Sequence, residues 1–207
     1  MDRTDELAAA ALRLVTVGGL SAVTFRSVAA ESGWSLGAVQ KTFPTKEALV
    51  RATLAYAQSS ISVRLSVDPG RPTLRAWLVE LVMATLPLDD ARRSACLISV
   101  AVSDRAPFDP ELAGSLAAWD ADLRGKLQLL AGRARSEGEL HPDVDGDVLA
   151  RAVLAFAAGL AGQLLYAPRD EADVRPLVQA TLAALTPAPE GAHPTAGGGA
   201  EDRLLRS

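Results

Sequence analysis

The stretch TFRSVAAESGWSLGAVQKTFPTKEAL, at positions 24–49, decides the fold. It predicts two short helices, Phe25–Ser32 and Leu36–Thr42, which are separated by a Gly-Trp turn. A hydroxyl residue that can cap a helix N-terminus, Thr24 or Ser35, precedes each of them. Two short helices joined by a tight glycine turn can place the second helix in the major groove of DNA. We therefore expect a helix-turn-helix.

Three small or apolar residues suit the packing of such a motif. Ala29 lets the two helices cross closely, Gly33 allows a turn that a side chain would strain, and Val39 is expected to face inward. The side chains expected to complete this small core are Phe25, Val28, Trp34, Phe43 and, from the preceding helix, Leu14.

The quoted stretch closely resembles the TetR family of bacterial repressors. The match covers about residues 5–55, and the run FPTKEAL at positions 43–49 is a hallmark of the family. The rest of the chain is similar only in helix pattern and length. The resemblance implies an all-α protein in which an N-terminal three-helix DNA-binding domain joins a C-terminal helical ligand-binding and dimerisation domain. It also implies a repressor that a small hydrophobic ligand releases from its DNA operator.

The resemblance implies DNA contacts for ten residues. Gln40 is expected to contact adenine with two hydrogen bonds, and Lys41 to reach guanine or phosphate. Family members commonly carry Tyr-His at these two positions, so a tyrosine contact to the DNA backbone is missing and the target sequence is expected to differ. The other implied contacts are Thr24 and Arg26 where the second helix meets phosphate, Ser35, Leu36, Gly37 and Ala38 at the start of the reading helix, and Thr42 and Lys46 at backbone-contacting positions.

Helical spacing of apolar residues continues along the rest of the chain. We expect a DNA-binding domain at 1–50, a ligand-binding and dimerisation domain at 51–186, and a disordered Pro-, Gly- and Ala-rich tail at 187–207. The further helices are expected at about 5–17, 46–67, 73–86, 90–103, 110–138, 145–166 and 175–185, the last with Pro176 in its first turn.

The resemblance also implies a ligand pocket among the middle helices. Apolar residues are spread there over four predicted helices with few charges between them, which favours a largely hydrophobic ligand of drug-like size. The alternative is an ordinary filled core. The candidate ligand-binding residues are Trp77, Leu81, Met83, Cys96, Val100, Trp119, Leu123 and Phe156.

The resemblance further implies that the last two long helices pair with their copies in a homodimer, as a four-helix interface. Glycines there permit close approach of helices, while leucines and valines offer apolar faces. The alternative is that these faces pack only within one chain. The candidate interface residues are Gly159, Leu160, Gly162, Leu164, Leu177, Val178, Leu182 and Leu185.

Composition indicates the compartment and class of partner. The formal net charge of −4 is not typical of a nucleic-acid binder, although only one face of such a protein needs to be basic. A single cysteine, Cys96, fits a reducing compartment. The acidic first residues do not form a signal peptide, and the apolar stretch 152–166 is short for a membrane span of about 20 residues. We expect a cytoplasmic protein that binds duplex operator DNA and a small-molecule effector, with no cofactor, metal or membrane.

Two other functions fit parts of the chain. Positions 33–37, GWSLG, match the nucleophile elbow of serine esterases, with Ser35 as the nucleophile. That elbow follows a strand, and this chain predicts none; only His141 and His193 could act as the base. A helical ligand-binding or interaction protein with decayed DNA contacts is the second alternative, which the low charge favours and the intact Gln40, Lys41 and Lys46 oppose.

The run HPDVDGD at positions 141–147 superficially resembles a metal-binding loop. Its glycine and its later residues do not have the spacing of a calcium loop. We therefore interpret the run as a polar turn whose aspartates cap the next helix.

Overall fold

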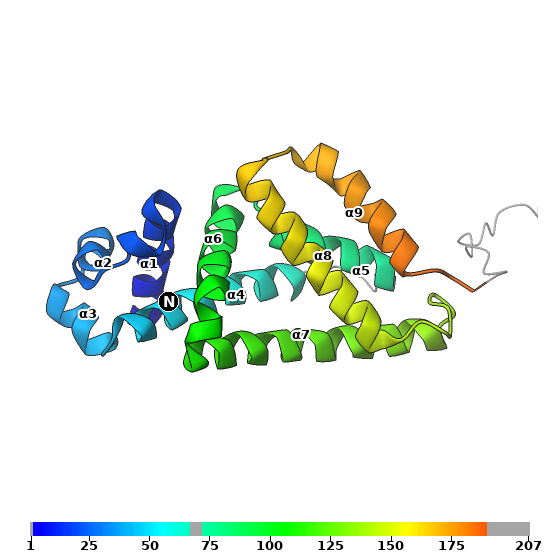
Figure 1. The fold of residues 1–207 in the computed structure, drawn as a ribbon, viewed down its shortest axis with the longest axis horizontal. Helices are drawn as coiled ribbons and strands as arrows, with labels where there is room; N and C mark the ends of the chain where they lie inside the picture. Colours follow the sequence, from blue (N-terminus) through cyan, green and yellow to red (C-terminus); the bar gives the residue numbers. More distant parts are fainter. Residues whose placement is uncertain (1, 67–71, 190–207) are drawn as a thin grey trace, which may run out of the picture.

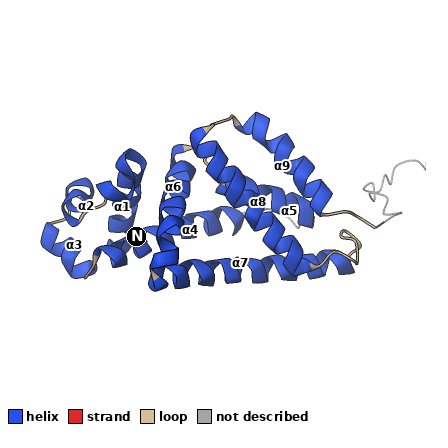
Figure 2. Cartoon of the chain, viewed as in Figure 1, coloured by secondary structure: helices blue, strands red, loops and turns tan. Residues whose placement is uncertain are grey.

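The structure is a computed structural model that describes residues 2–66 and 72–189, except for the side chains of 60–66. All regular secondary structure in these residues is helical, as the sequence predicts (Figure 2). The helices are α1 Arg3–Gly18, α2 Phe25–Ser32, α3 Leu36–Thr42, α4 Lys46–Ser66, α5 Leu74–Thr85, α6 Asp90–Arg105, α7 Pro110–Ser136, α8 Gly146–Tyr166 and α9 Glu171–Leu185, with the short 3₁₀ turns Gly19–Ala22 and Ala106–Phe108.

Helices α1 to α3 form a small unit at one end of an elongated molecule (Figure 1). Its core extends beyond this unit, because Leu54 of α4 and Ile98 and Val102 of α6 belong to the same buried cluster. A second core joins α5, α7, α8 and α9. Helix α6 stands between the two parts, and α4 runs from one into the other (Figure 1). The predicted boundary at residue 50 therefore falls inside a continuous helix.

The last helix begins earlier than the sequence predicts. It starts at Glu171 rather than near Arg175, so that Pro176 lies in its second turn instead of its first. The Glu171 carboxylate accepts a hydrogen bond from the Arg175 guanidinium at 2.8 Å, one turn further along. Two acidic residues in the first turn also complement the helix dipole. These interactions support the additional turn although proline lacks one backbone donor.

Helix α8 is longer than the apolar stretch that the sequence singles out. Asp145 caps it, so that it begins at Gly146 and has 21 residues. By length and mean hydropathy alone it could cross a membrane, a test that core helices of soluble proteins also pass, and 33% of its most apolar window is buried in the molecule. Much of this apolar helix thus has no cover from the described residues of its own chain. Residues 190–207 of the predicted tail lie outside the described residues.

Candidate functional site

Helices α2 and α3 meet as the helix-turn-helix pattern predicts. Val28 and Val39 have no exposed surface, and Ala29 is 9% exposed. Between the helices, Gly33 has a φ of 76°, in the left-handed region that a side chain would strain. Figure 1 shows the two short helices at the end of the molecule, away from the second core. The geometry is that of a motif whose second helix is free to enter a groove.

Hydroxyl groups fix the residues at which α2 and α3 begin. The Thr24 Oγ1 accepts a hydrogen bond from the Ser27 amide at 3.1 Å, and the Ser27 Oγ accepts one from the Thr24 amide at 2.9 Å, a reciprocal capping box. The Ser35 Oγ accepts a hydrogen bond from the Ala38 amide at 3.2 Å. The start of α3, which would enter the groove first, is therefore set by its own sequence.

Helix α1 is fastened to this motif by polar contacts. The Trp34 Nε1 donates a hydrogen bond to Glu6 Oε2 at 3.0 Å, and the Arg3 guanidinium lies 4.8 Å from the centre of the Trp34 ring. Arg13 pairs with Glu31 of α2 at 2.6 Å. Because both α2 and the turn are attached to α1, a movement of α1 carries the motif with it.

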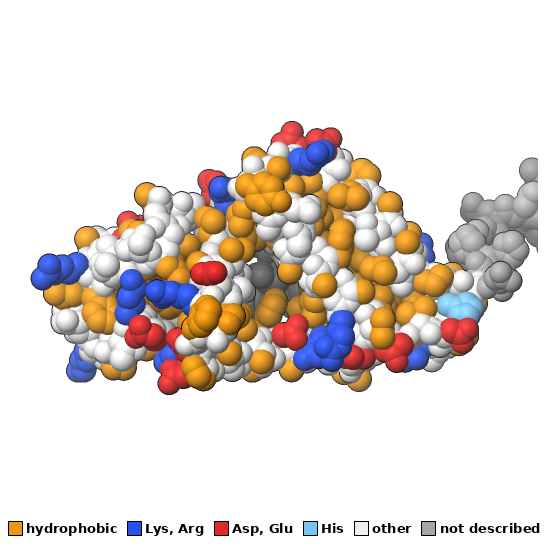
Figure 3. Space-filling model, viewed as in Figure 1, with side chains coloured by type: hydrophobic (Ala, Val, Ile, Leu, Met, Phe, Trp, Pro, Cys, Tyr) orange, Lys and Arg blue, Asp and Glu red, His pale blue; other side chains and the backbone are white. Residues whose placement is uncertain are grey.

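The residues implied to contact DNA lie mostly on the surface. Within the described residues, Arg26, Lys41 and Lys46 make no ion pair, so their charges remain free for phosphate. Figure 3 shows basic side chains at the end of the molecule that α2 and α3 form. The exposed members of the set are Thr24, Arg26, Ser35, Leu36, Gly37, Gln40 and Lys41, and the half-buried ones are Ala38, Thr42 and Lys46.

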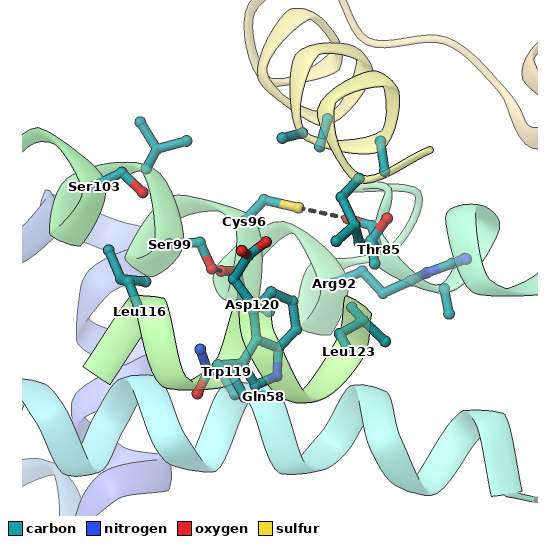
Figure 4. A pocket seen from close by; sticks show the side chains of 18 of the residues that line it. Gln58, Thr85, Arg92, Cys96, Ser99, Ser103, Leu116, Trp119, Asp120 and Leu123 are labelled. Atoms are coloured by element: carbon teal, nitrogen blue, oxygen red, sulfur yellow. Dashed lines mark hydrogen bonds between the residues drawn. The ribbon is translucent and has the colours of Figure 1, made fainter. Parts of the chain in front are cut away.

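A cavity of about 590 Å³ lies among the middle helices. Its volume falls in the range of pockets that hold drug-sized ligands, roughly 300–1,000 Å³. Figure 3 shows a deep hollow in the middle of the molecule, and Figure 4 shows α6 and α7 contributing side chains to the pocket. Side chains from α1 and α4 to α8 line it, so both parts of the molecule contribute to its wall.

Five of the eight candidate ligand-binding residues line this cavity: Leu81, Cys96, Val100, Trp119 and Leu123. The other three do not. Met83 is buried in the second core, and Trp77 and Phe156 pack against that core from elsewhere. Helical spacing identifies apolar positions but not which of two apolar neighbours faces a void. The lining residues that sequence reasoning missed include Leu12, Tyr56, Gln58, Thr85, Arg92, Ser99, Ser103 and Asp120.

Cys96 is a protonated thiol in the cavity wall. Its Sγ donates a hydrogen bond to the Thr85 carbonyl oxygen at 3.0 Å. Burial raises the pKa of this thiol from 9.0 to about 11, against the opposing effect of Arg92 and Arg93. Since the thiolate is the reactive form, the position suits a packing residue better than a redox sensor.

Helix α6 lines the cavity with one face and packs against α1 with the other. One face carries Cys96, Ser99 and other cavity-lining residues, while the opposite face packs Ile98 and Val102 into the core shared with α1. On this second face the Thr16 Oγ1 of α1 lies 2.5 Å from the Ser94 Oγ, which itself donates to the Asp90 carbonyl oxygen at 2.7 Å. Helix α6 therefore connects the cavity wall to α1, which also contributes Leu12 to the wall directly.

The domain comparison agrees with both parts of the molecule. The model described as "Bacterial regulatory proteins, tetR family" matches residues 7–53, and the model described as "BetI-type transcriptional repressor, C-terminal" matches residues 74–187. The chain belongs to the TetR family. It is therefore a transcriptional regulator of the helix-turn-helix class, as its sequence predicts.

Relatives of this TetR-family chain extend over nearly its whole length. It is 27% identical over 191 residues to the nucleoid occlusion factor SlmA of Enterobacter sp. (strain 638), covering 87% of this chain and 94% of that protein. A transcriptional regulator of Rhodococcus sp. Rha1 has a similar structure, with a TM-score of 0.77, 26% identity, and coverage of 89% and 96%. A regulator from Saccharomonospora viridis in complex with choline shares the fold, with a TM-score of 0.73, 20% identity, and coverage of 87% and 93%.

The structure corrects the expected interface of this TetR-family protein. Four candidate interface residues, Leu160, Leu164, Val178 and Leu182, are buried in the core of their own chain and are not on the surface. Both faces of α8 are rich in apolar or small residues, so the pattern alone does not tell which one turns inward. Of the other candidates, Gly159 and Leu177 are exposed, Gly162 and Leu185 are half-buried, and Gly162 also lines the cavity.

The alternative sites have structural roles here. Ser35 follows helix α2, not a strand, and its hydroxyl caps α3. His141 lies in the loop after α7, and its amide donates to the Pro187 carbonyl oxygen at 2.8 Å. Asp145 accepts hydrogen bonds from two amides of α8, as expected of a polar turn that caps a helix. The other proposed base, His193, lies outside the described residues.

Proposed function

We propose that this TetR-family protein is a cytoplasmic, non-catalytic repressor that binds a near-palindromic operator as a homodimer. A small, largely hydrophobic molecule in the cavity releases it. The observation that carries this proposal is that α6 forms part of the cavity wall with one face and packs against α1 with the other. The neighbour solved with choline supports the proposal, because its fold holds a small organic molecule. Residues 1–50 would read DNA, and residues 51–186 would bind the ligand and the second copy.

The uncovered face of α8 supports the homodimer. Ala155 and Gly159 are exposed one turn apart along this helix, and Leu177 of α9 is 51% exposed. Small residues allow two helices to approach closely, and a second copy would remove this apolar surface from water. A symmetric dimer presents two reading helices, which accounts for a near-palindromic operator with half-sites about one helical turn apart.

Release follows from a change in the distance between the two reading helices. A ligand that fills the cavity presses on α6, which is packed against α1, and α1 carries the helix-turn-helix with it. Moving the protein from mostly bound to mostly released requires the ligand to favour the released form by roughly 10⁴-fold, or about 5.5 kcal/mol. The many apolar side chains of the cavity wall are suited to supply such a preference.

Two substitutions on the DNA-facing surface test this function. We expect Lys46→Ala to weaken binding to every duplex and to lower the slope of log affinity against log salt by about one unit per subunit, because it removes a phosphate contact. Gln40→Ala should instead relax base preference at one operator position, at a cost of about 1–3 kcal/mol. Fluorescence anisotropy over a salt series and a panel of operator variants measures both. Equal behaviour of the two variants would contradict the assigned roles, and salt-insensitive binding by the unaltered protein would favour decayed DNA contacts.

Removing the largest cavity side chain should separate ligand response from DNA binding. Trp119 lies on α7 in the cavity wall (Figure 4), to which α2 and α3 contribute no described residue. We expect Trp119→Ala to weaken an identified effector by at least about 10-fold while operator affinity changes less than about 3-fold, since an aromatic side chain that a ligand covers contributes about 2 kcal/mol or more. Operator titrations with and without effector measure both quantities. Parallel losses of the two affinities would show that the tryptophan only supports the fold.

The hydroxyl pair Thr16 and Ser94, between α1 and α6, should affect the coupling between effector binding and operator binding. We expect Thr16→Val and Ser94→Ala each to reduce the ratio between effector affinities of the free and the operator-bound protein, because each removes the polar link between the helices. In a double-mutant cycle the two changes should not be additive. Thr53→Val is the matched control, since its hydroxyl donates only within α4, to the Leu49 carbonyl oxygen at 2.8 Å. An unchanged ratio in both single variants would exclude the pair from the coupling route.

A further inference from the structure

Two hydroxyl groups and the thiol of the cavity wall already use their protons in hydrogen bonds within the chain. The Thr85 hydroxyl donates to the Val82 carbonyl oxygen at 2.7 Å, and the Ser99 hydroxyl donates to the Ala95 carbonyl oxygen at 2.8 Å. The Cys96 thiol likewise donates its proton, to the Thr85 carbonyl oxygen. Each of these two hydroxyl oxygens keeps the capacity to accept a hydrogen bond, whereas its one proton is already used.

The charged groups in the wall also favour a ligand that donates hydrogen bonds. Asp120 is the acidic residue of the lining, and Arg92 is the basic one. Arg92 is held by carboxylates outside the cavity, with its Nε 2.8 Å from Asp89 and its Nη2 3.7 Å from Glu171, and its Nη1 donates to the Met83 carbonyl oxygen at 3.0 Å. Figure 4 shows its side chain running away from Trp119 and Asp120. The positive charge of Arg92 is therefore directed away from the cavity.

Asp120 is less completely engaged. Its Oδ2 lies 2.9 Å from the Arg124 Nε, but that nitrogen is without a hydrogen-bond partner, because the two groups are poorly aligned. The carboxylate side chain is 47% exposed, and Arg124 itself is not part of the lining. The other nearby cation, Arg151, makes a hydrogen bond to Asp147 at 2.7 Å. In Figure 4 Asp120, Ser99 and Cys96 project into the same part of the pocket.

We propose that the cavity selects an amphipathic amine: a molecule whose protonated, hydrogen-bond-donating end meets Asp120 and the hydroxyl oxygen of Ser99 while its apolar body lies against Trp119, Leu81 and Leu123. A carboxylic acid of the same shape is disfavoured, because its anionic end would face Asp120 and acceptors whose protons are already used. This inference rests on the proposed ligand-regulated function and names the chemical class of its effector.

The test is a matched series of probes with one apolar body: decylamine, decan-1-ol and decanoate. Isothermal titration calorimetry at neutral pH gives each affinity for the full-length protein. We expect decylamine to bind at least 10-fold more tightly than decanoate. Asp120→Asn should reduce this ratio to below about 3-fold and leave the affinity for decan-1-ol unchanged. The matched control is Asp122→Asn on the same helix, where the carboxylate pairs with Lys126 on the surface at 2.7 Å; it should keep the ratio.

The outcomes separate the inference from the function on which it rests. Decanoate binding as tightly as decylamine, or a ratio that survives Asp120→Asn, overturns the amine assignment and leaves ligand regulation intact. If none of the three probes binds and none displaces the protein from its operator, both the amine assignment and the ligand-regulated function fail. Melting of each variant by circular dichroism checks that Asp120→Asn remains folded, and Asp120→Glu, which keeps the charge, should preserve the preference for the amine.

Discussion

Replacing Gly159 by arginine is expected to break the homodimer and to lower operator affinity by at least about 100-fold. Gly159 lies on the exposed face of α8, and a Cβ added there meets no heavy atom within 4 Å, so the single chain has room for the side chain. In the proposed dimer the same arginine would be trapped between apolar helices without a partner. A monomer then contacts one half-site and loses the contribution of the second.

The matched control is Gly114→Arg on α7, another exposed helical glycine with nothing within 4 Å of an added Cβ. Both changes replace glycine by the same charged helix former, so that effects on helix propensity are shared. Multi-angle light scattering should give a monomer mass for Gly159→Arg and a dimer mass for the control. A dimer of unchanged operator affinity in Gly159→Arg would move the interface away from this face of α8.

Alkylation of Cys96 is expected to be about 100-fold slower in the folded protein than in the unfolded chain near pH 8. Burial raises the pKa of this thiol from 9.0 to about 11, and the reacting species is the thiolate. The difference in pKa lowers the thiolate population by about two orders of magnitude. Because the chain has one cysteine, intact-mass spectrometry after iodoacetamide treatment reports on this thiol alone. Equal rates in native and denaturing buffer would show that the thiol is accessible and ionised.

The raised pKa of Cys96 also makes the free energy of unfolding depend on pH. The folded state holds the Cys96 proton more tightly than the unfolded chain does. The stabilisation that Cys96 contributes is therefore complete below pH 9.0 and is lost as the pH rises to about 11. Its size is on the order of 3 kcal/mol for a shift of about two units. The difference in unfolding free energy between the unaltered protein and Cys96→Ala, measured across this pH window, isolates it from other groups. A pH-independent difference would contradict the shift.

The helix-turn-helix could be predicted closely because its signals are local. Thr24 and Ser35 cap the two helices and Gly33 ends the first, so the bounds of α2 and α3 agree with the sequence prediction. The same holds for α8, where the aspartate before Gly146 sets the start. Such signals act within one turn of a helix and need no knowledge of the rest of the fold.

The interior of the second part could be predicted only in outline. Val178 and Leu182 were expected at an interface, yet both are fully buried within the chain, because helical spacing does not say which element covers a face. The choice between Leu81, which lines the cavity, and Met83, which does not, depends on neighbours far away in the sequence. The link between Thr16 and Ser94 joins residues 78 positions apart and has no local signal.

Selection of random duplexes by the purified protein, followed by sequencing, tests the central claim most directly. The account predicts enrichment of a near-palindrome whose half-sites lie about one helical turn apart, since a symmetric dimer presents two copies of α3. It also predicts that Gln40→Ala loses preference at a symmetric pair of positions within that site. Enrichment of no sequence, or of a single site without symmetry that Gln40→Ala recognises equally well, would contradict it.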